Sequence, residues 1–235
     1  KGYGVGIITT DSLSGATPAC FSSHANKRGD EDEIISGQAI SDIDLFFGAG
    51  IGAYQSNQAK FEENNYTFLT DFSEINTNSD KIIASFSKVV STDGTNQTPT
   101  LEMLTSAAIK FFEKKFPNGY FLMIEGAHID KRSHDNNILS MMKYLKSFDQ
   151  SIKIASDTLA QQSSVAIFIT ADHETGGLSV AANKEAISNS LYTRSGHSSR
   201  NVPFYFWLSD VQPINFPTKI DNTDVFKLCK ALLDV

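Results

Sequence analysis

Short apolar runs alternate with longer segments of helical periodicity along this chain, and the alternation limits the possible folds more than any other feature. The runs at 120–124 and 164–170 have no polar face, which is typical of central strands buried on both sides. Further strands are expected at residues 5–9, 44–48, 81–86 and 202–208. Helices are expected at residues 16–27, 32–41, 98–116, 137–161 and 221–233. This order predicts an α/β fold with a mostly parallel central sheet and helices on both faces.

Composition narrows the class of protein. The chain has 235 residues, is 40% hydrophobic and carries a formal net charge of −7. These values are typical of a soluble globular chain and argue against a general nucleic-acid binder, which needs a basic face. No apolar run approaches the roughly 18 residues of a membrane helix. Cys20 and Cys229 are too few for a disulfide framework, and we expect both to be buried thiols on helices, with a bridge between them left open.

Two polar stretches interrupt the alternation. Residues 55–65 and 91–99 are rich in polar side chains, and we expect both to be surface insertions. The closing helix at 221–233 begins with Asp221 and Asn222, either of which could cap it. No internal repeat or linker is visible, so the sequence predicts one domain.

Histidines and carboxylates gather at the predicted strand boundaries. Asp130 and His134 follow the strand at 120–124, and their spacing places both on one face of a helical turn. Asp172 and His173 follow the strand at 164–170, and both can reach one ion only where that strand has ended. His197 precedes the strand at 202–208. Ligands bind at the carboxyl ends of strands in α/β sheets, and zinc takes imidazole and carboxylate ligands.

Each of these groups of residues also has an explanation that involves no metal. An Asp-His pair occurs often by chance, an Asp and a His four residues apart are usually a solvated pair, and a lone histidine beside glycine is usually a loop residue. Their joint position favours a metal site. His24 and His128 are expected to be structural or surface residues.

Several motifs then resemble the alkaline phosphatase family. Glu125-Gly126, Ile129-Asp130 and His134, followed by Ala171-Asp172-His173 and Gly196-His197, resemble the metal-binding segments of that family in the same order. Thr9-Thr10 and the Ala-Thr-Pro-Ala run at 16–19, with His24 and Arg28 downstream, resemble an earlier segment. The run at 222–226 resembles its closing Thr-Asp-Val-Phe segment. The resemblance spans nearly the whole chain.

The resemblance implies a site with two zinc ions and one magnesium ion. It implies a first zinc on Asp130, His134 and His197, a second zinc on Asp172 and His173, and magnesium on Thr17 and Glu125. It also implies that Arg28 is the catalytic residue that holds phosphate oxygens, and that Lys131 binds substrate near the phosphate. The implied reaction is phosphomonoester hydrolysis through a phosphoserine intermediate, with one zinc activating the serine and the other stabilising the leaving oxygen.

The nucleophile of this reaction is expected upstream of the chain. In the family, the nucleophilic serine and a metal-bridging aspartate normally precede the Ala-Thr-Pro-Ala segment, which here begins at Ala16. Residues 1–235 would then be part of a catalytic domain. Ser12, after Asp11, is the alternative nucleophile, but Leu13 stands where that motif has a small residue. We expect Ser12 to be a capping or loop serine, and we note Gly15 where the family often has Asp or His.

Other functions stay open at this point. A sulfatase, a phosphodiesterase or a cofactor-independent phosphoglycerate mutase shares paired-metal ligands, although the spacing from Glu125 to His134 favours the phosphatase. A metal-binding domain without catalysis is a further alternative. The family resemblance implies a small-molecule phosphomonoester as substrate and a periplasmic or secreted location, and it leaves a homodimer open.

Overall fold

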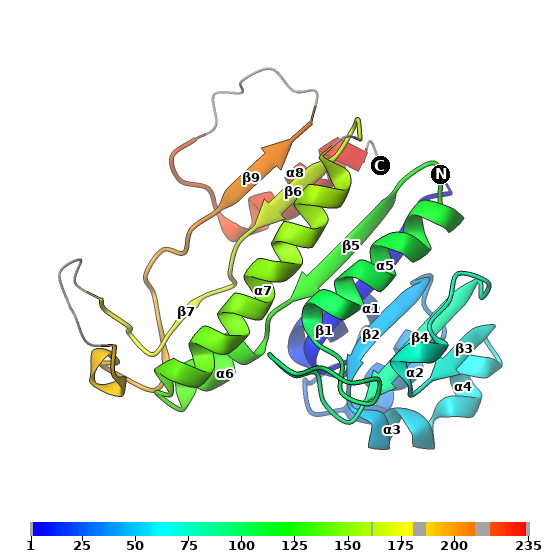
Figure 1. Ribbon diagram of the computed structural model, residues 1–235, viewed down its shortest axis with the longest axis horizontal. Coiled ribbons are helices and arrows are strands. Elements are labelled where there is room, and N and C mark those ends of the chain that lie inside the picture. The colour runs from blue at the N-terminus through cyan, green and yellow to red at the C-terminus, as the bar shows by residue number, and fades with distance from the viewer. Residues whose placement is uncertain (1, 161, 181–186, 210–216, 234–235) are drawn as a thin grey trace. The chain divides into compact units, whose positions relative to one another are not determined.

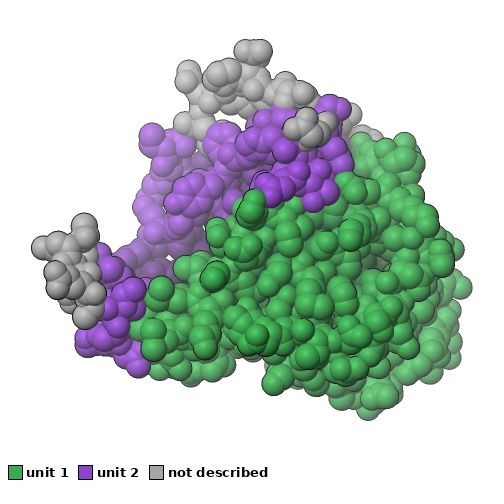
Figure 2. All heavy atoms as spheres, in the orientation of Figure 1, with its two compact units in different colours: residues 1–155 green, residues 156–235 purple. Residues whose placement is uncertain are grey.

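Figure 1 shows the computed structural model of the chain, which describes residues 2–160, 162–180, 187–209 and 217–233. These residues form two compact units, Lys1–Ala155 and Ser156–Val235, coloured separately in Figure 2. Helix α7 (Ile138–Leu159) carries the chain from the first unit into the second. Residue 161, the expected end of this helix, lies outside the described residues.

The first unit is built on a five-stranded sheet in which every pair of neighbours is parallel. The strand order is β3-β4-β2-β1-β5. The strands are β1 (Gly4–Ser12), β2 (Leu45–Ala49), β3 (Tyr66–Leu69), β4 (Lys81–Phe86) and β5 (Tyr120–Glu125). The predicted parallel α/β sheet is therefore confirmed. However, β5 was expected to be central and lies at one end of this five-strand order.

Helices cover both faces of the sheet, as the apolar strands require. Ile8 and Phe47 face one side and pack with Leu104 and Phe111 of α5 (Leu101–Lys115). Their neighbours in sequence point to the opposite side, because side chains alternate along a strand. There they pack with residues of α2 (Glu31–Ala39), α3 (Ile51–Ser56) and α4 (Gln58–Glu62). Figure 1 shows α5 in front of the sheet.

Two further segments of this unit differ from the structure predicted for them. The helix expected at 16–27 is α1 (Ala16–Ser22), which ends five residues early. The hydroxyls of Ser22 and Ser23 donate to the carbonyl oxygens of Pro18 and Ala19, and Ser23 is already extended. Such local bonds compete with continuation of the helix.

The second failure is the stretch at 55–65. It is largely helical rather than a surface insertion, and its Phe61 is fully buried with its ring edge-on to Tyr66. The stretch at 91–99 is a loop, as predicted, between the paired residues Val90 and Thr100.

The second unit holds two small antiparallel pairs. β6 (Ala166–Ile169) pairs with β9 (Tyr205–Leu208), and β7 (Glu174–Thr175) pairs with β8 (His197–Ser198). The segment at 164–170 is expected as a central strand of a mostly parallel sheet, and its pairing with β9 is antiparallel. The closing helix α8 (Asn222–Leu233) begins as predicted, because Asp221 Oδ1 accepts bonds from the backbone N–H and the hydroxyl of Thr223.

Both cysteines lie on helices, as predicted. Cys20 on α1 and Cys229 on α8 are free thiols, but Cys20 is exposed and Cys229 half-buried, so the prediction that both are buried is wrong. The face of α1 that packs inward carries Pro18, Ala19 and Ser22 instead. Among the described residues, none of the helices has the length and apolar character needed to cross a membrane.

A buried polar network joins the helices on one face of the sheet. Gln38 is fully buried, and its Nε2 donates to the carbonyl oxygen of Leu13 at 2.8 Å and to Ser22 Oγ at 3.0 Å. The Tyr54 hydroxyl donates to Gln38 Oε1 at 2.5 Å. Burial raises the pKa of Tyr54 well above its usual value, so its hydroxyl stays protonated as a donor.

Replacing Gln38 with leucine should therefore destabilise the fold. We expect Gln38→Leu to lower the free energy of unfolding by about 1–3 kcal/mol, because buried polar groups lose their partners. Urea unfolding followed by circular dichroism measures this. The control is Gln55→Leu on exposed α3 surface, which should change stability by less than about 0.5 kcal/mol. Equal effects of the two substitutions would contradict the role of the network.

Candidate metal centre

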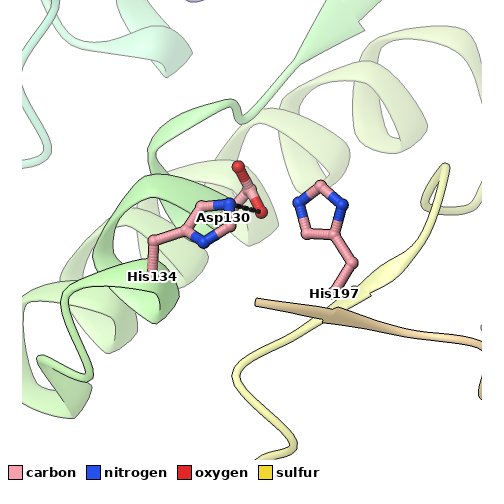
Figure 3. A group of neighbouring side chains, drawn as sticks. All are labelled: Asp130, His134 and His197. Atoms are coloured by element: carbon pink, nitrogen blue, oxygen red, sulfur yellow. Dashed lines mark ion pairs between the residues drawn. The ribbon is translucent and has the colours of Figure 1, made fainter. Parts of the chain in front are cut away.

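Asp130 and His134 lie together on α6 (His128–His134), in the first unit. His134 Nε2 is 3.4 Å from Asp130 Oδ1, and the side chains are 40% and 38% exposed respectively (Figure 3). The predicted helical turn thus places both on one helix face. A carboxylate and an imidazole at this separation are a donor pair of the kind that zinc takes. His197, also drawn in Figure 3, belongs to the second unit.

Three consecutive residues at the end of β1 hold the segment that leads into α6. Thr9 Oγ1 donates to Glu125 Oε2 at 2.6 Å, and the Thr10 hydroxyl accepts the His128 N–H at 3.2 Å. Lys131 Nζ forms an ion pair with Asp11 Oδ1 at 2.5 Å. We noted Thr9-Thr10 in the sequence without assigning a role, because the partners lie more than a hundred residues away.

His128 is structural, in line with the sequence expectation. Its ring stacks on Tyr144 with 4.6 Å between ring centroids, and its Nδ1 lies 3.1 Å from Thr10 Oγ1. Burial, with a smaller contribution from the charge of Lys131, lowers the pKa of His128. The ring therefore favours the neutral form and anchors the start of α6 beside β1.

The early candidate residues lie around α1. Thr17 is in the first turn of this helix, and Arg28 is exposed in the turn that follows it. Gly15 takes the N-cap position of α1 and has no side chain to bond the helix.

Ser12 is the last residue of β1. Its Oγ lies 2.7 Å from Ser14 Oγ, and the Ser14 hydroxyl donates to Glu31 Oε1 at 2.6 Å. The N-cap position of α1 belongs to Gly15, so Ser12 ends a strand and does not cap this helix, whereas a capping or loop serine is expected from the sequence.

The second unit brings its own candidate ligands together. Asp172 Oδ2 is 3.2 Å from His173 Nε2, and the His173 and His197 rings stack with 3.5 Å between centroids. Strand β6 ends at Ile169, before Asp172 and His173. The sequence predicts this end, because two consecutive side chains of a strand point to opposite faces. Gly176 and Gly177 have positive φ angles of 88° and 58°, which permit the chain to bend before it returns to β8.

Glu174 is a further carboxylate of this unit for which the sequence predicts no role. Glu174 in β7 accepts a hydrogen bond from the Ser198 hydroxyl in β8, and this bond lowers the pKa of Glu174. Ser198 directly follows His197 and pairs with Glu174 in the antiparallel register. The bond therefore joins the strand beside His173 to the strand that carries His197. The strands β7 and β8 have only two residues each, so the sequence pattern does not predict the hydrogen bond between Glu174 and Ser198.

Comparison with known proteins identifies the family. Residues 58–208 match the family model described as Alkaline phosphatase, which is more than half of the chain. The chain belongs to the alkaline phosphatase family. Alkaline phosphatase 3 of Bacillus subtilis is 31% identical over 199 residues, which cover 78% of this chain and 42% of that protein. The alkaline phosphatase of Schizosaccharomyces pombe is 29% identical over 240 residues, covering 89% of this chain and 42% of that protein.

Solved alkaline phosphatases share the fold. The enzyme from the Antarctic bacterium TAB5 superposes with a TM-score of 0.73 at 29% identity, over 88% of this chain and 65% of that one. A mutant of the TAB5 enzyme with Mg bound in its M3 site gives a TM-score of 0.74 at 27% identity, over 88% of this chain and 66% of that one. The chain spans about two fifths of the curated relatives that it matches.

Proposed function

We propose that this chain is part of the catalytic domain of a metal-dependent alkaline phosphatase that hydrolyses small-molecule phosphomonoesters. The observation that carries the proposal is the Asp130–His134 pair on α6, at 3.4 Å, in a chain of this family. We further propose a periplasmic or secreted location, on family resemblance alone.

The donor types in both units suit the metals that the family resemblance implies. We assign one zinc to Asp130, His134 and His197, and a second zinc to Asp172 and His173. Carboxylate and imidazole groups are the usual ligands of zinc. We assign magnesium to Thr17 and Glu125, because magnesium prefers oxygen donors. When bound, zinc stabilises charge on phosphoryl oxygens and lowers the pKa of coordinated water to about 7.

The chain's own side chains would bind the phosphate group. Arg28 has a planar guanidinium that can bind two phosphate oxygens at once. Lys131 carries a positive charge beside the ligand Asp130, and Asp11 holds its ammonium group. Ser12 Oγ lies 2.7 Å from Ser14 Oγ at the end of β1, and we propose that Ser12 is not the nucleophilic serine.

The proposed role of Arg28 can be tested by phosphate binding. The chain is loaded with zinc and magnesium, and its affinity for inorganic phosphate is measured by calorimetry. We expect Arg28→Ala to weaken binding by about 10- to 100-fold, the usual value of hydrogen bonds to charged groups. Lys27→Ala, at the neighbouring exposed lysine, is the matched control and should have a much smaller effect.

Two outcomes would count against the proposal. Equal losses of phosphate affinity in the Arg28→Ala and Lys27→Ala variants would indicate general charge attraction rather than a specific phosphate site. Rapid p-nitrophenyl phosphate hydrolysis by the chain alone, abolished by Ser12→Ala, would show that Ser12 is the nucleophile.

A further inference from the structure

We propose that Thr9 is a positioning residue for the magnesium ligand Glu125, so that a buried hydroxyl on β1 sets the metal affinity of a carboxylate on β5. This inference rests on the proposed function, because Glu125 is assigned to magnesium there. The proposal concerns only side chains of the first unit.

The two side chains meet through the register of the sheet. Thr9 and Glu125 are paired residues at the carboxyl ends of the parallel strands β1 and β5. Thr9 is fully buried, and its Oγ1 lies 2.6 Å from Glu125 Oε2. The same Oγ1 accepts the backbone N–H of Asp11 at 3.0 Å. Because that bond uses Oγ1 as an acceptor, the single hydroxyl proton of Thr9 is directed to Glu125.

Packing on the other side of β1 fixes the direction of this hydroxyl. The Thr9 Cγ2 methyl lies beside Gly48 of β2, where a Cβ on Gly48 would be only 2.8 Å from it. The absence of a side chain at Gly48 makes room for the methyl. A β-branched side chain has few χ1 rotamers, so a methyl held toward β2 leaves the hydroxyl toward β5.

A bond of this kind bears on metal binding because it orients the ligand. A carboxylate offers about four lone-pair sites, so accepting one bond from Thr9 does not exhaust its capacity to bind an ion. Partners that hydrogen-bond metal ligands fix the orientation of those ligands and tune affinity. Thr10 provides a natural contrast, because it is also buried but its hydroxyl bonds His128, which is not an assigned ligand.

The test is a calorimetric titration of the purified chain with Mg²⁺. Thr9→Val keeps the shape of the side chain and removes the hydroxyl, and we expect it to weaken Mg²⁺ binding by about 10- to 100-fold. Thr9→Ser keeps the hydroxyl and should restore most of the affinity. Thr10→Val is the matched control and should leave Mg²⁺ affinity unchanged. Circular dichroism establishes that each variant is folded, and Thr9→Ala replaces Thr9→Val if the valine variant does not fold.

The outcomes separate this proposal from the one on which it rests. Unchanged Mg²⁺ affinity in Thr9→Val would overturn the role of Thr9 while leaving Glu125 as a ligand. Equal losses in Thr9→Val and Thr10→Val would also overturn it, because they would reflect general weakening of β1. A wild-type chain that binds no Mg²⁺ would instead overturn the assignment of Glu125, and the role of Thr9 with it.

Discussion

The variant His134→Ala is expected to lose zinc from the site on α6. His134 and Asp130 form the donor pair at 3.4 Å, and alanine removes the imidazole while keeping a good helix former. Loss of an outer-shell partner weakens metal binding by about 10- to 100-fold, and loss of a ligand should exceed that. Elemental analysis after dialysis against a fixed free zinc concentration should therefore give a lower zinc content per chain.

A matched histidine makes this measurement specific. His24 is exposed and follows α1, and we expect it to be no ligand, so His24→Ala should keep the zinc content of the wild-type chain. Unchanged zinc content in His134→Ala would refute the ligand assignment. Equal zinc loss in the two variants would point to adventitious binding by surface histidines.

The i,i+4 spacing of Asp130 and His134 shows what a sequence can reveal about this site. Helix geometry is local, so the spacing alone predicted that these side chains share a face. The hydrogen bond from Thr9 to Glu125 and the ion pair between Lys131 and Asp11 could not be predicted in the same way. Their partners are 116 and 120 residues apart (125 − 9 and 131 − 11), and only the register of β1 and β5 brings them together.

The same difference between local and long-range contacts determines which parts of the fold could be predicted from the sequence. The short, mostly apolar run in β4 predicted the position of that strand well, because burial on both faces of a sheet leaves a clear pattern. β7 and β8 have two residues each, which is too short for any periodicity. The antiparallel pairing of β6 with β9 is set by the partner strand and was not evident from the β6 sequence. Cys20 was misassigned because its helix face depends on how α1 packs.

The core of the first unit depends on Phe112, a residue of α5 that packs against β1. The ring is fully buried, stacks on Tyr120 at 5.0 Å between centroids and meets Phe111 edge-on at 5.2 Å. A Cβ on Gly6 of β1 would lie 2.5 Å from Phe112 Cε2, so glycine is what lets the ring approach the strand. The strand held in this way is the one that carries Thr9 and Asp11 to the site.

Phe112→Ala should consequently lower the free energy of unfolding by about 3–5 kcal/mol, through lost burial and the cavity left behind. This is a large share of the roughly 5–15 kcal/mol that stabilises a typical domain, so much of the first unit should unfold at modest urea concentrations. Phe21→Ala is the matched control, because Phe21 is 51% exposed and should contribute far less. Urea unfolding measured by circular dichroism compares the two. Similar midpoints for Phe112→Ala and the wild-type chain would mean that α5 is held to β1 by other contacts.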